Sequence, residues 1–156
     1  GTGSSGIISF TSIPSTYQNL QLRFTGLPNS TNTTFYMRFN NDQGSNYGAS
    51  KLIANGSTVS GSDSSTSTSQ FNIMYITPPS GSSQGGVCII DIANYASTSI
   101  YKTFNLIGGY DNNGSGYTTM QSGAWGSSSA INRIDFQTAS GSWTTTTKVA
   151  LYGIKG

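Results

Sequence analysis

The chain has 156 residues, of which only 8% are charged, and its seven basic and five acidic side chains leave a formal net charge of +2. The basic residues are scattered along the chain without a cluster that could collect phosphates, so nucleic acid is not expected as a partner. No apolar stretch approaches the roughly 20 residues of a membrane span, so membrane insertion is not expected either. Solubility comes instead from Ser, Thr, Asn and Gly. These residues disfavour helix interiors, whereas the 12% aromatic content disfavours disorder. We therefore expect a folded, mainly β protein.

The chain divides into a short leading segment and one domain. Residues 1–6, Gly-Thr-Gly-Ser-Ser-Gly, have the composition of a flexible linker or of a remnant of a longer polypeptide. Residues 7–156 have the length of a single domain.

Apolar and polar side chains alternate with a period of two along most of this domain, which predicts strands with one buried face. In chain order the predicted strands are 7–13, 20–25, 35–40, 48–54, 70–77, 86–93, 100–108, 117–124, 133–137 and 147–154. Within them, the run 87–92 is apolar almost throughout, which is typical of a strand packed on both faces. The segment 55–69 is low in complexity, and we expect it to be a long exposed loop.

About ten short strands separated by turn residues predict an all-β fold, a two-sheet antiparallel β-sandwich. A jelly-roll-like arrangement is the first choice. An immunoglobulin-like sandwich is the second, because the Cys…Trp…Cys spacing of that fold is missing.

Residues that could carry catalysis are few. The chain has no His, so a Ser-His-Asp or Cys-His arrangement and an imidazole zinc site are excluded. Cys88 lies in an apolar run and is expected to be a buried thiol. Asp91 and Asp135 alternate with apolar neighbours, so each should face solvent or pair with a basic residue. The segment 111–116 resembles the start of a calcium loop, but Ser122 replaces the required Glu, which favours a hairpin turn. No enzyme activity, metal or cofactor is expected.

Four aromatic residues near predicted loops are candidate ligand-stacking rings: Trp125, Trp143, Tyr117 and Tyr47. Flat rings beside short polar side chains can stack on sugars or anchor a protein contact. The alternative is that each ring caps one end of the sandwich core, and this alternative is the more frequent outcome for any single ring.

Five segments resemble a loose group of tailed-bacteriophage virion proteins. They are ISFTSIPSTY at 8–17, LQLR at 20–23, RFN to GSNY at 38–47, IDIANY to YKT at 90–103, and the C-terminal ALYGIKG at 150–156. The resemblance covers nearly the whole chain after the first six residues, and its motifs are structural.

This resemblance implies a non-enzymatic structural protein on the virion exterior, either a capsid decoration or cement protein or a module of a tail appendage. It carries over no catalytic residues. It implies assembly with other virion proteins and with copies of the same chain, and we expect a homotrimer. The alternative function is a carbohydrate- or receptor-binding module of a tail fibre, with a host surface glycan as the partner.

Overall fold

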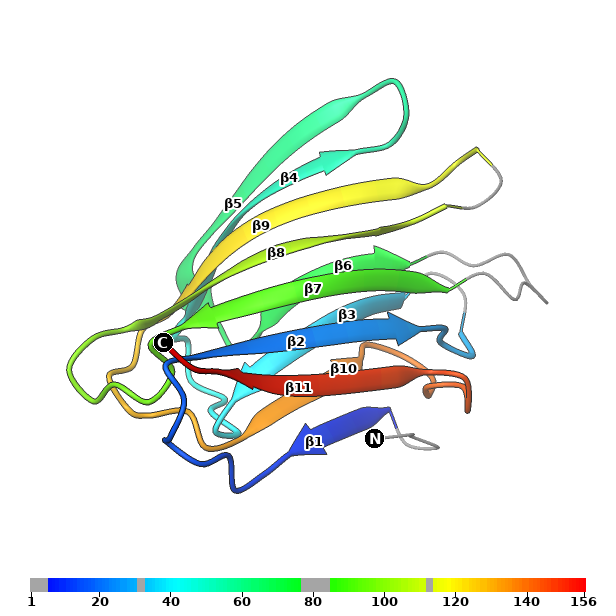
Figure 1. The fold of residues 1–156 in the computed structure, drawn as a ribbon. Helices are drawn as coiled ribbons and strands as arrows, with labels where there is room; N and C mark the ends of the chain where they lie inside the picture. The colour runs from blue at the N-terminus through cyan, green and yellow to red at the C-terminus, as the bar shows by residue number, and fades with distance from the viewer. Residues whose placement is uncertain (1–5, 31–32, 77–84, 112–113) are drawn as a thin grey trace.

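The computed structural model describes residues 6–30, 33–76, 85–111 and 114–156, and within them the chain is all β, without helices (Figure 1). A four-stranded sheet has the order β1 (Ile7–Phe10), β10 (Ile134–Thr138), β3 (Thr33–Phe39) and β6 (Phe71–Ile76). A seven-stranded sheet has the order β11 (Lys148–Ile154), β2 (Asn19–Gly26), β7 (Gly86–Ala93), β8 (Lys102–Tyr110), β9 (Tyr117–Trp125), β4 (Tyr47–Ala54) and β5 (Val59–Thr68). All of these neighbours pair antiparallel.

The chain repeatedly crosses from one sheet to the other, and its strands pair in a nested order. The early strand β2 pairs with the last strand β11, β3 pairs with β10, and β4 pairs with β9. These pairings connect the first half of the chain with the second half within two packed antiparallel sheets. The predicted two-sheet antiparallel β-sandwich is confirmed.

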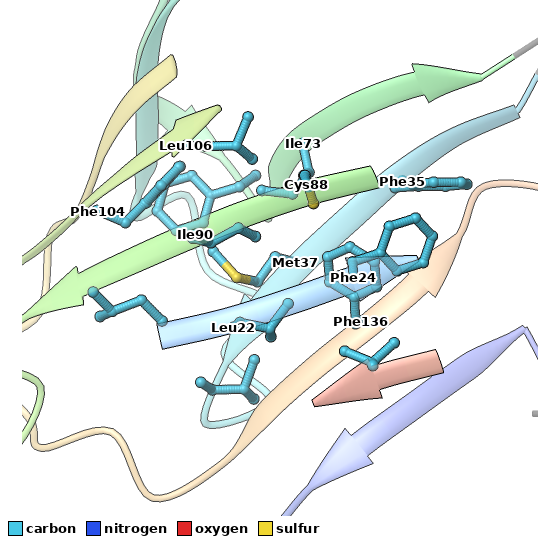
Figure 2. Packing of buried hydrophobic residues seen from close by; sticks show 14 of the residues in the cluster. Leu22, Phe24, Phe35, Met37, Ile73, Cys88, Ile90, Phe104, Leu106 and Phe136 are labelled. Carbon is cyan, nitrogen blue, oxygen red and sulfur yellow. The ribbon is translucent and has the colours of Figure 1, made fainter. Parts of the chain in front are cut away.

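Alternation places one face of each sheet in a common core. Leu20, Leu22 and Phe24 of β2 are buried, as are Phe35, Met37 and Phe39 of β3, whereas the residues between them are more exposed. Figure 2 shows four of these side chains, Leu22, Phe24, Phe35 and Met37, meeting in the space between the sheets. Antiparallel sandwiches obtain their stability from such interdigitated inner faces.

The aromatic residues of the core form two groups, one toward each end of the sandwich. Phe24, Phe35, Phe136 and Trp143 form the first group, with ring centroids 4.6–6.1 Å apart. Phe39, Tyr47, Phe71, Phe104 and Trp125 form the second, with several edge-to-face contacts. Edge-to-face pairs of this kind are favourable beyond the area that they bury.

The predicted loop at 55–69 is wrong, because Val59–Thr68 forms strand β5. This strand lies at the edge of the seven-stranded sheet and pairs only with β4 among the described strands. In this strand residues 59–64 and Ser67 are exposed, and Ser, Thr and Gly give the segment no apolar alternation. Backbone hydrogen bonds to β4, rather than buried side chains, hold it in the sheet.

The first described residue, Gly6, is held against the end of β10. Its carbonyl accepts a hydrogen bond from the Thr138 amide at 2.9 Å, while residues 1–5 of the predicted linker 1–6 lie outside the described residues. The first predicted strand, 7–13, ends early, at Phe10. Among the described residues there is no helix with the length and apolar character needed to cross a membrane.

Candidate functional site

Trp125 and Tyr47, two of the predicted ligand-stacking rings, are core residues. Trp125 is 2% exposed and Tyr47 is fully buried. The Trp125 indole Nε1 donates a 2.7 Å hydrogen bond to Asp42 Oδ2, and the Tyr47 hydroxyl donates to the Asp42 carbonyl at 3.0 Å. Both rings therefore close one end of the core over the turn that contains Asp42. The prediction that they are exposed platforms is wrong, and the core-capping alternative is correct.

Trp143 is also 2% exposed, and it closes the opposite end of the core. It lies in the β10–β11 connection, where it forms a bridge with Pro28, and its ring centroid is 4.6 Å from that of Phe35. No face of the indole is free to stack on a ligand. This candidate is wrong for the same physical reason: a large ring at a strand end gains more from burial against the core than from exposure.

Tyr117 is the remaining ring candidate, and the structure places it at a surface hollow. It is half-buried at the start of β9, and its ring lies 5.7 Å from that of Tyr110. The hollow beside it is a groove of about 870 Å³, which is also lined by Arg23 and Asp111. The sequence prediction thus locates one rim of this groove but not its floor.

The floor belongs to an exposed apolar surface on the outer face of the seven-stranded sheet. We call this surface the apolar patch. Its members are six large apolar side chains of β4, β5, β7, β8 and β9 that are 38–64% exposed: Leu52, Val59, Val87, Ile89, Ile107 and Met120. Four of them form one continuous row across neighbouring strands, because Ile89 is paired with Ile107, Ile107 with Met120, and Met120 with Leu52.

Gly109 keeps the sheet surface low within the patch. It lies between Val87 and Thr118 in the register of β7, β8 and β9, and a Cβ atom there would clash with the Tyr117 carbonyl oxygen. Val87, Ile89 and Ile107 surround that position and line the groove. The result is a concave apolar surface, which is uncommon on a soluble monomer unless it binds something.

The other half of the same outer face is polar. Two residues farther along each strand, the row continues as Asp91, Asn105, Ser122 and Ser50, in direct register with one another. Asp91 accepts a 2.8 Å hydrogen bond from the Gln21 side chain. The outer face is therefore divided into an apolar half and a polar half within the same strands.

Sequence reasoning did not identify the patch, although a signal for it was present. The apolar run at 87–92 predicts burial on both faces, but only Cys88, Ile90 and Ile92 are buried, while Val87 and Ile89 are exposed. The prediction of burial on both faces is wrong within the single chain. A strand that is apolar on both faces and covered on one is the signal for an interface.

The remaining chemical groups are structural. Cys88 is buried, as predicted, and burial raises the pKa of its thiol to about 12. Asp135 forms an ion pair with Arg133 at 2.9 Å, and Asp91 is exposed, both as predicted. Asp111 begins the connection between β8 and β9 and accepts a hydrogen bond from the Gly114 amide at 3.2 Å. In the described part of the chain, no three His, Cys, Asp or Glu residues are grouped as metal ligands.

Comparison with protein-family models, with curated proteins and with solved structures found no match to this chain. The fold and the site define the chain as an all-β sandwich with an apolar patch on one half of an outer face.

Proposed function

We propose that this protein is a non-enzymatic structural module of the exterior of a bacteriophage particle, either a capsid decoration protein or part of a tail appendage. The proposal starts from the resemblance of five segments to virion proteins of tailed phages. The observation that carries it is the apolar patch, which offers a surface for assembly and is not used within the single chain.

The patch suits a protein contact better than a small-molecule reaction site. It is made of aliphatic and Met side chains on a rigid sheet, and apolar side chains of this kind are typical of the centre of a protein interface. The groove beside Tyr117 can accept an apolar side chain of a partner. In the assembly that we propose, three copies of the chain form a homotrimer that buries the patch, and other virion proteins bind this trimer.

Met120 at the centre of the patch provides the first test. Its partners in the strand register are Ile107 of β8 and Leu52 of β4. Met120→Asp therefore places a charge between the apolar side chains of two neighbouring strands. We expect sedimentation velocity at micromolar concentration to show a trimer for the original chain. For Met120→Asp we expect the dissociation constant to rise at least about tenfold, the equivalent of 1.4 kcal/mol.

Ser122→Asp is the matched control, because Ser122 lies on the same strand and the same face, two residues away in the polar half. This variant should remain trimeric. A monomer for the original chain at micromolar concentration, or equal weakening by both variants, would contradict the role of the patch.

Labelling of purified particles with an antibody tests the location separately, and particles without the protein would contradict a virion role.

A further inference from the structure

A second hollow lies on the opposite side of the seven-stranded sheet, under the hairpin formed by β4 and β5. It is a cavity of about 100 Å³ between this hairpin and β6, the edge strand of the smaller sheet. Lys51 of β4, Ser62 of β5, Asn72 of β6 and Gln121 of β9 line it. Unlike the groove at the apolar patch, this cavity is lined mainly by polar groups.

Gln121 presents an unpartnered acceptor in this cavity. Its side chain belongs to the inner face of β9 and is 5% exposed, and its Oε1 atom has no hydrogen-bond partner in the described part of the chain. A buried acceptor without a partner costs free energy, and native proteins rarely keep one unless water or a ligand satisfies it. The position can therefore take a donor from water or from a ligand.

Lys51 presents a donor at the neighbouring position. It is directly paired with Gln121 across the two strands, and it is half-buried. Its ammonium group makes no hydrogen bond or ion pair with any other residue that the structure describes. Burial lowers the pKa of this lysine, because its charged form has lost hydrating water and has gained no partner that compensates.

We propose that this cavity receives the edge of one sugar residue of a saccharide, through two adjacent hydroxyl groups, while the ring itself stays outside because about 100 Å³ is less than a whole pyranose occupies. One hydroxyl oxygen accepts a hydrogen bond from the Lys51 ammonium group, and an O–H donates to Gln121 Oε1. A hydroxyl group is both donor and acceptor, so neighbouring hydroxyls match the two unsatisfied groups. The carboxylate residue Asp63 also borders the cavity, which favours a neutral ligand over an anion. This binding site is independent of the assembly proposed above.

Titration with glucose, galactose, mannose and N-acetylglucosamine, followed by two-dimensional ¹⁵N–¹H NMR, tests the proposal. We expect saturable shifts at millimolar concentration for at least one sugar, centred on the amides of residues 51, 62 and 121. Lys51→Met and Gln121→Leu should each weaken this binding by about tenfold or more, because each removes one hydrogen-bonding partner. Ser50→Ala and Ser122→Ala are matched controls on the same strands, with side chains on the outer face, and should bind as before.

Gln121→Glu keeps the result interpretable if an apolar replacement disturbs folding. A carboxylate at this position attracts the Lys51 ammonium group opposite it by charge, which the neutral amide does not, and the resulting ion pair occupies the site. We expect this variant to melt at the same or a higher temperature and to lose sugar binding. The absence of saturable shifts with all four sugars would overturn the proposal. Shifts that persist in Lys51→Met and Gln121→Glu, or a sugar-soaked crystal with only water at Gln121 Oε1, would also overturn it.

Discussion

Replacement of Phe35 by alanine is expected to lower the free energy of unfolding by about 3–5 kcal/mol. Phe35 is fully buried on β3, and its ring packs against three others, with centroids 4.6 Å from Trp143, 5.0 Å from Phe24 and 6.1 Å from Phe136. Removal of the ring leaves a cavity among rigid aromatic neighbours, which cannot collapse to fill it.

Urea denaturation at neutral pH measures this effect. Tyr36→Ala is the matched control, because Tyr36 is the next residue on β3 and is only partly buried, on the opposite face of the strand. We expect this control to lose about 1 kcal/mol or less. A loss below about 1 kcal/mol for Phe35→Ala would show that the ring does not pack as described.

The architecture was predictable because the core positions follow a local rule. On β2, Leu20, Leu22 and Phe24 alternate with Gln21 and Arg23, and the structure buries the first set. A period of two is visible in the sequence without knowledge of the partner strands. The same pattern in several segments separated by turns is sufficient to predict two packed sheets.

Strand β5 could not be predicted by this rule. Ser60, Gly61 and Ser62 have no apolar alternation because β5 is an edge strand with little of the core beneath it. Its conformation is fixed by pairing with β4, in which Ile53 is opposite Ser60 and Lys51 is opposite Ser62. Strand pairing is a tertiary interaction, and composition alone favours a loop for such a segment.

The candidate sites depend on strand order, which the sequence does not state. The patch exists because Ile107 of β8 is next to Met120 of β9, and Met120 is next to Leu52 of β4. Likewise, the cavity exists because Lys51 is opposite Gln121. The prediction that the Trp125 ring is exposed was wrong for the same reason, because its partners Phe39 and Asp42 are distant in sequence. A local pattern identifies a ring near a turn but not the residues that cover it.

Alkaline conditions are expected to destabilise the fold, and Cys88 should be a principal cause. Burial raises the pKa of this thiol from 9.0 to about 12, and burial also raises the pKa of Tyr47 above its ordinary value. Between pH 9 and 12 the unfolded chain loses the thiol proton while the native chain keeps it, so the unfolded state binds fewer protons. Stability therefore falls as pH rises, by about 1.4 kcal/mol per pH unit from this one group.

Cys88→Ala isolates this contribution, because alanine has no proton to lose. We expect the original chain to lose about 2 kcal/mol from the thiol by about pH 10.5, measured as the free energy of unfolding in urea across the alkaline range. The variant should start from a somewhat lower stability at pH 7, because it lacks the buried sulfur, and should then decline less steeply above pH 9. Tyr47 adds to the slope that remains above pH 10, because its hydroxyl donates to the Asp42 carbonyl only while it is protonated. The lowered pKa values of Lys51 and Lys102 act in the opposite direction. Parallel curves for the two proteins would mean that the Cys88 thiol ionises in the native fold as easily as in the unfolded chain, which its burial between the two sheets should prevent.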